Sequence, residues 1–273
     1  MGRAQGTRPS RRARHSGWVP TYHGAWSMIT IPPLVGIIEG GWRWVHLPFL
    51  TTWWLGYFCF FAASLWLRSH GKRRYLRPVV VYGAASACFG IVTALSEPEI
   101  LRWVPVFLPL VGLAAGAAWL RKDRSVWAGF VTVAAACLTL PVTWDIATAG
   151  TSGYATTPLV WLHTLLLFGY FAGTVLYVKT NIRERGSVRY LTASVAWHIV
   201  WLVLVIIFVL VSSTSATGFA HPLSAWNILV WAGLVVRSIG VPIYDARVRR
   251  VPVKAIGVGE LVASALVAVA LVV

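Results

Sequence analysis

Long apolar runs alternate with short polar segments along the whole chain. Each run holds about 20 residues, the length that an α-helix needs to cross the roughly 30 Å hydrocarbon core of a bilayer. Strands of a membrane barrel alternate in polarity at every second residue, and these runs do not. Because a segment in lipid must satisfy its own backbone groups, the runs are expected to be helical. The pattern therefore predicts an all-α, polytopic transmembrane helical bundle.

The runs predict one transmembrane domain over residues 20–273, preceded by a basic cytoplasmic tail at 1–19 that we expect to be disordered. Nine spans are predicted, at 24–40, 47–67, 76–95, 103–120, 126–146, 158–178, 190–211, 224–243 and 253–272. The first run continues past any small-residue cleavage site, so we interpret it as a retained helix and not as a signal peptide.

Composition and charge support a membrane protein. The chain is 58% hydrophobic and only 12% charged, which is too little charge to cover a soluble domain. The chain has 24 Lys and Arg. Only Arg43 and Arg102 fall in the loops that follow the first, third, fifth and seventh spans, and the other 22 lie on or near the other face of the membrane. This positive-inside pattern predicts a cytoplasmic N-terminus and an outside C-terminus. The net charge of +16 then predicts contact with anionic inner-leaflet lipid and requires no nucleic acid.

Residues 20–36 carry the pattern P-x-x-H-G-A-W-x-M-x-x-x-P-x-x-x-G, which brings His23 to the cytoplasmic end of the first span. This stretch resembles the N-terminal signature of the YwiC-like family of bacterial membrane proteins. The resemblance implies a multi-pass protein of the bacterial plasma (inner) membrane, and it implies no particular chemistry.

The predicted layout also has a weaker similarity to UbiA-type intramembrane prenyltransferases. In that family, cytosolic loops after spans 2 and 6 carry aspartate-rich motifs that bind magnesium. Here the same two loops are strongly basic, and Glu184 is their only acid. Several carboxylate oxygens are needed to hold a diphosphate through Mg²⁺, so the sequence predicts no metal site and argues against that chemistry.

Three polar residues are predicted at one depth inside the bilayer. Arg237 lies eight residues before Asp245, Glu260 eight residues after Pro252, and His198 eight residues after Tyr190. At 1.5 Å per residue, each is about 12 Å below its membrane boundary. Since spans 8 and 9 should be antiparallel neighbours, we predict an intramembrane ion pair between Arg237 and Glu260.

These residues suggest a pocket open to the cytoplasm, with His198 and Glu260 as acid–base candidates and His23, Arg183, Arg185 and Arg237 as binding residues. Simpler interpretations stay open. The ion pair can serve only to lock helix register, His198 can donate to a carbonyl group, and the basic loops can reflect topology alone. Glu39, Glu97 and Asp145 are expected at the outer interface, where they can be hydrated and need no special role.

Three functions remain open at this point. The first is a membrane-embedded enzyme that handles an amphipathic or lipid-linked anionic substrate from the cytoplasmic leaflet. The second is a transporter or carrier of a small solute or lipid, and the third is a non-catalytic accessory protein of a membrane complex. The sequence names no cofactor, no substrate and no oligomeric state.

Overall fold

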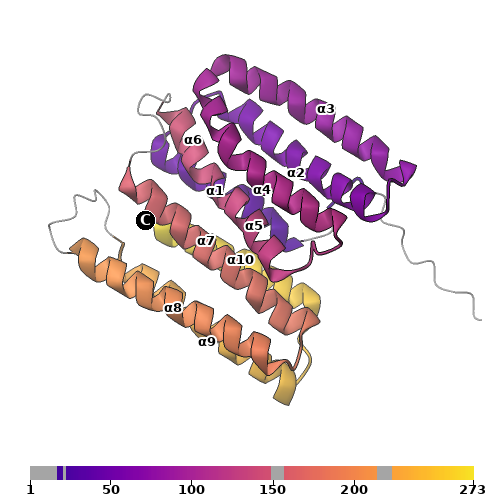
Figure 1. Cartoon of the computed structure of the whole chain (residues 1–273). Coiled ribbons are helices and arrows are strands. Elements are labelled where there is room, and N and C mark those ends of the chain that lie inside the picture. The colour runs from indigo at the N-terminus through magenta and orange to yellow at the C-terminus, as the bar shows by residue number, and fades with distance from the viewer. Residues whose placement is uncertain (1–16, 21–22, 149–156, 214–222) are drawn as a thin grey trace, which may run out of the picture.

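A computed structural model describes residues 17–20, 23–148, 157–213 and 223–273 of the chain. These residues form helices and no strand, so the all-α prediction is confirmed for them (Figure 1). The α-helices are α1 (His23–Gly40), α2 (His46–Arg68), α3 (Arg73–Ser96), α4 (Val104–Trp119), α5 (Val126–Cys137), α6 (Thr139–Ala147), α7 (Pro158–Val178), α8 (Val188–Ser213), α9 (Ala225–Arg247) and α10 (Val253–Val272). A 3₁₀ helix, η1 (Pro98–Trp103), precedes α4, and a π-helical turn, η2 (Lys179–Arg183), continues α7.

Eight helical segments of the described chain are long and apolar enough to cross a membrane, with η1 counted with α4, α5 with α6, and α7 with η2. The chain is therefore a multi-pass membrane protein. The predicted span at 24–40 forms α1 but is not among the eight. It carries the polar or helix-breaking residues His23, Pro32, Pro33 and Glu39.

Helix α1 has a central place in the bundle, where it packs against α6, α10 and α5. Its Ile29, Val35 and Ile37 side chains are buried. In contrast, the pairs α2–α3 and α8–α9 lie at opposite edges of the molecule (Figure 1). A helix packed among other helices can carry polar groups that a lipid-facing helix cannot, and this location agrees with the presence of Glu39 in α1.

Neighbouring helices donate hydrogen bonds to the α1 backbone around its two prolines. Pro33 has no N–H to donate to the Ile29 carbonyl oxygen, and Trp53 Nε1 of α2 donates to that oxygen at 2.8 Å. Thr143 Oγ1 of α6 donates to the Pro33 carbonyl oxygen at 3.0 Å. Gly36 permits this approach, because a Cβ there would lie 2.2 Å from the Leu140 carbonyl oxygen.

Two predicted spans differ from simple helices. The span at 126–146 is divided at Leu138 into α5 and α6, because Pro141 has no N–H for the Cys137 carbonyl oxygen. The span at 158–178 continues through η2, where the Glu184 N–H reaches back five residues to the Lys179 carbonyl oxygen at 2.8 Å. The π-helical turn changes the direction in which the side chains at the end of α7 project.

We predict that Gly36→Ala destabilises the protein by about 1–3 kcal/mol, because the added methyl group would force α1 and α6 apart. Thermal unfolding in detergent measures the effect. The matched control is Gly112→Ala in α4, where a Cβ would meet nothing within 4 Å. Equal midpoints for the two variants would contradict the importance of the α1–α6 contact.

Candidate functional site: a cavity at the basic end of the bundle

A cavity of about 820 Å³ opens among α1, α5, α7 with η2, and α10. Its lining comes from one end of each element: residues 24–28 of α1, 123–132 before and within α5, 171–183 of α7 and η2, and 253–261 of α10. These are the ends joined by the basic loops. The cavity is therefore confined to the half of the bundle nearest those loops.

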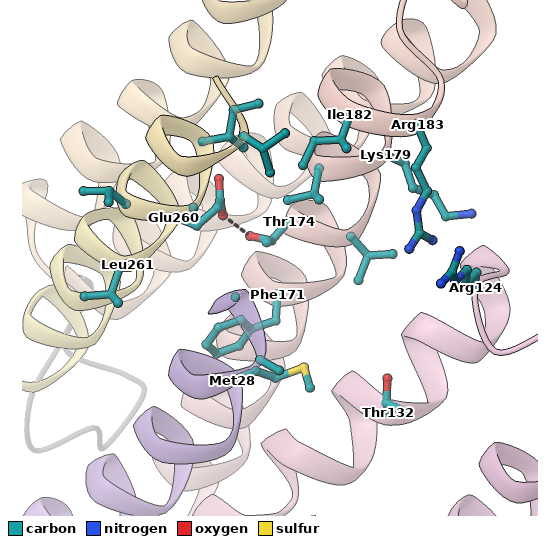
Figure 2. A pocket seen from close by; sticks show the side chains of 18 of the residues that line it. Met28, Arg124, Thr132, Phe171, Thr174, Lys179, Ile182, Arg183, Glu260 and Leu261 are labelled. Carbon is teal, nitrogen blue, oxygen red and sulfur yellow. Dashed lines mark hydrogen bonds between the residues drawn. The ribbon is translucent and has the colours of Figure 1, made fainter. Parts of the chain in front are cut away.

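The inner wall of the cavity is mainly apolar. Met28 and Phe171 face the cavity from α1 and α7, and Leu261 faces it from α10 (Figure 2). No side chain fills the position of Gly257, where a Cβ would meet nothing within 4 Å. Such a wall suits a hydrocarbon chain or another apolar group better than a hydrated solute.

Basic side chains surround the mouth of the cavity. Arg124, Lys179 and Arg183 gather on one side of it (Figure 2), and Lys254 lines it from α10. None of the four forms an ion pair with an acid of the described chain. Asp123 also lines the mouth, but Arg68 holds its carboxylate at 3.0 Å.

Three helices begin at this mouth. The first residues of α1 and α10, together with Ser125, the N-cap of α5, line the cavity. The N-terminal end of a helix carries backbone N–H groups without helical acceptors and about half a positive charge. The mouth therefore combines side-chain cations and three helix N-termini, which favour an anion, with the C-terminal end of α7 and η2, whose dipole has the opposite sign.

Of the two acids that line the cavity, Glu260 is the deeply buried one, with 3% of its surface exposed. Arg237 Nη1 lies 2.5 Å from Glu260 Oε1, so the structure brings the two predicted partners together. Thr174 donates to Glu260 Oε2 at 2.8 Å, as Figure 2 shows. Tyr170 donates to the Glu260 carbonyl oxygen at 3.2 Å. The carboxylate is thus held in place from two neighbouring helices.

Arg237 itself lies behind Glu260 and does not line the cavity. Its guanidinium group lies over the Tyr177 ring, 4.2 Å from the ring centre. The pair therefore joins α9, α10 and α7 inside the bundle. This geometry suits a lock of helix register better than a direct binding role for Arg237.

His198 does not share the cavity with Glu260, contrary to the expected common pocket floor. Its ring is 1% exposed and packs between α8 and α7, where Nε2 would lie 3.2 Å from a Cβ placed on Gly173. Nδ1 donates to the Ser194 carbonyl oxygen at 2.7 Å. His198 belongs to α8, and its side chain packs against a face of α7 that does not line the cavity.

Arg185 also differs from its expected place at the rim. Its guanidinium group donates to the Val251 carbonyl oxygen at 2.8 Å and to the Asn181 carbonyl oxygen, and it lies 3.5 Å from Asp245 Oδ1. Arg185 thus fastens η2 to the α9–α10 connection. Arg183 does line the cavity, whereas the side chain of His23 is outside the described part of the structure.

A second polar cluster lies at the opposite end of the bundle. Arg43 contacts Glu97 at 2.7 Å, and Arg102 contacts Asp145 at 2.9 Å. Trp103 Nε1 also donates to Asp145, at 2.8 Å. The two cations that depart from the charge pattern are thus paired with carboxylates.

Two of the three outer carboxylates are buried and all three have a partner, which differs from carboxylates that are simply hydrated. Glu97 and Asp145 are 8% and 5% exposed. The third, Glu39 of α1, lies with its Oε1 2.5 Å from His163 Nδ1 of α7. The sequence offered no signal for these pairings, because the partners come from separate helices.

Metal ligands are not clustered in the described residues, which contain no group of three or more His, Cys, Asp or Glu side chains placed to hold an ion. The mouth residues that sequence reasoning missed are Arg124, Lys179 and Lys254. All three belong to basic segments that the sequence analysis attributed to membrane topology. Their convergence depends on which helices pack together.

Fold and cavity define a multi-pass helical membrane protein with a one-sided, basic-mouthed cavity. Residues 19–144 match the family model described as YwiC-like protein. The YwiC-like resemblance found at residues 20–36 is thereby confirmed, and the chain has a YwiC-like N-terminal region that includes the α1 and α5 walls of the cavity.

Two relatives extend the similarity beyond this region. A Bacillus subtilis (strain 168) protein with the name "Uncharacterized protein YwiC" is 27% identical over 182 residues, which cover 66% of this chain and 74% of that protein. An "Uncharacterized protein" of Haemophilus influenzae (strain ATCC 51907 / DSM 11121 / KW20 / Rd) is 23% identical over 194 residues, which cover 69% of this chain and 77% of the relative. No solved structure matches the chain.

We predict that Glu260→Met alone destabilises the protein more than the double change Arg237→Met with Glu260→Met. The single change leaves a buried cation without its partner, at a cost of about 3–5 kcal/mol, whereas the double change replaces both charges by apolar groups. Unfolding in detergent micelles measures both. A double variant less stable than the single one would show that the pair does not act as a structural unit.

Proposed function

We propose that the protein binds an amphipathic or lipid-linked anion from the cytoplasmic leaflet of a bacterial inner membrane. One observation carries the proposal: three helix N-termini and four basic side chains without ion-pair partners in the described chain converge on the mouth of a mainly apolar cavity. The anionic group would contact the mouth, and the apolar part would lie against Met28, Phe171 and Leu261.

The proposed orientation has nine spans, with the N-terminus in the cytoplasm and the C-terminus outside. Helix α1 supports the ninth span, because Gly24 lines the basic mouth while Gly40 packs beside Ala147 at the far end of α6. Its 18 residues correspond to about 27 Å along the helix axis. It thus runs parallel to α5 and α6 over a similar depth.

The depth of the cavity favours a lipid-handling protein over a carrier that alternates between two faces. Its lining ends at Met28, Thr132, Phe171 and Leu261, and buried core residues lie beyond them toward the outer end. Access from one side suits a membrane-embedded enzyme or lipid-binding protein. For a chemical step, Glu260 is poorly placed as a base, because Arg237 and Thr174 already engage its oxygens.

Reporter fusions test the topology. Fusions at the N-terminus and after residues 72, 123, 185 and 249 should report cytoplasm, and fusions after 98, 152 and 217 should report the outside. The N-terminal fusion separates nine spans from eight, since an α1 that fails to cross would bring the N-terminus to the side of residue 98. An outside report at the N-terminus, with the other sites as expected, would refute the ninth span.

Filling the cavity tests the binding site. Gly257→Leu should abolish saturable binding of a fluorescent phosphatidic acid in micelles while leaving thermal stability unchanged, since the new side chain enters open space. Gly259→Leu is the matched control: it has the same open surroundings on α10 but does not line the cavity. Wild-type binding no stronger for phosphatidic acid than for phosphatidylcholine would contradict the anion site.

A further inference from the structure

The basic side chains at the mouth are distinguished from other cations of the same face by the cavity that they share. Arg68 and Arg185 are both held by acids, Asp123 and Asp245. In contrast, Arg124, Arg183 and Lys254 have no carboxylate within 4 Å in the described chain, although they line a common cavity. Lys179 likewise forms no ion pair there, and its ammonium group lies 5.7 Å from the Tyr190 ring centre.

Arg124, Arg183 and Lys254 are exposed, and their like charges together create a positive potential at the mouth that attracts an anion. The N-terminal dipoles of α1, α5 and α10 add positive potential at the same place, and the C-terminal dipole of α7 with η2 offsets part of it. A single negative charge would neutralise only a small part of this field. The charge of the mouth therefore matches a multivalent anion better than a monovalent one.

Both acidic side chains of the cavity lining are already paired with an arginine, so neither is available to hold a divalent cation. Of the lining acids, Asp123 is paired with Arg68, and Glu260 is paired with Arg237. A divalent cation bridging to a phosphate needs carboxylate or carbonyl oxygens as ligands. The side chains present here supply N–H donors instead, which bind phosphate oxygens directly.

From this geometry we propose that the ligand's head group is a phosphomonoester or diphosphate with at least two negative charges, bound directly by Arg124, Lys179, Arg183 and Lys254 without a bridging divalent cation. This rests on the proposed function, because it specifies the anion at the same mouth. The apolar part of the ligand does not enter the argument.

Two fluorescent lipids with identical acyl chains test the proposal. Phosphatidic acid carries a phosphomonoester, with about −1.5 to −2 charges at neutral pH, whereas phosphatidylglycerol carries a phosphodiester with a single charge. Wild-type protein in uncharged detergent micelles with EDTA should bind phosphatidic acid at least about tenfold more tightly. Added Mg²⁺ should not tighten that binding.

Arg183→Gln should reduce the preference for phosphatidic acid severalfold, because it removes a cation from the mouth. Arg189→Gln is the matched control: it changes an exposed cation of the same face that does not line the cavity, and it should leave the ratio unchanged. Thermal unfolding of both variants excludes a folding defect as the cause.

The outcomes separate the two proposals. Equal affinity for the two lipids, a preference unchanged by Arg183→Gln, or binding that requires Mg²⁺ would overturn the multivalent head group and leave the anion site standing. Failure of wild-type protein to bind either lipid above phosphatidylcholine would overturn the proposed function itself.

Discussion

Inside a bilayer no water satisfies a backbone group, and α1 is the helix on which this constraint acts most strongly. Pro33 leaves the Ile29 carbonyl oxygen without a helical donor, and Trp53 supplies one. Gly36 brings the α1 backbone against α6, where Thr143 donates to the Pro33 carbonyl oxygen. Because neighbouring helices replace lipid around α1, its N-terminal turn can be placed inside the bundle. The cavity depends on that placement, since the first residues of α1 form part of its wall.

The same constraint separates two kinds of charge. Charges that join helices are paired: Arg237 with Glu260, Arg43 with Glu97, and Arg102 with Asp145. The cations at the cavity mouth lie at the basic end and have no such partners among the described residues. A charge paired inside the bundle contributes to helix register, whereas a charge directed at an open mouth is available to a ligand. Other cations of the basic end also lack an acid partner in the described chain, so what distinguishes the mouth cations is the cavity that they share.

Sequence reasoning succeeded where helical rise alone decides the answer. Equal offsets from the membrane boundary brought Arg237 and Glu260 to one level, and the structure has them in contact. Rise does not determine the direction of a side chain around its helix, so His198 was assigned to the wrong pocket. The convergence of α1, α5 and α10 could not be predicted either, because it depends on packing order. Helix α1 is not among the eight long apolar segments, although it packs against α6, α10 and α5.

The bilayer around the protein determines which part of the cavity could discriminate between amphiphiles. A hydrocarbon chain in a bilayer is already in an apolar medium, so its transfer to the wall around Met28 and Phe171 gains little from the hydrophobic effect. An anionic head group at the mouth instead meets fixed cations and helix dipoles beside a low-dielectric interior, where Coulomb attraction is stronger than in water. Affinity differences between amphiphiles must therefore arise mainly at the mouth. In the proposed function, the apolar wall would set the shape that can enter, and the charges of the mouth would determine which amphiphile is held.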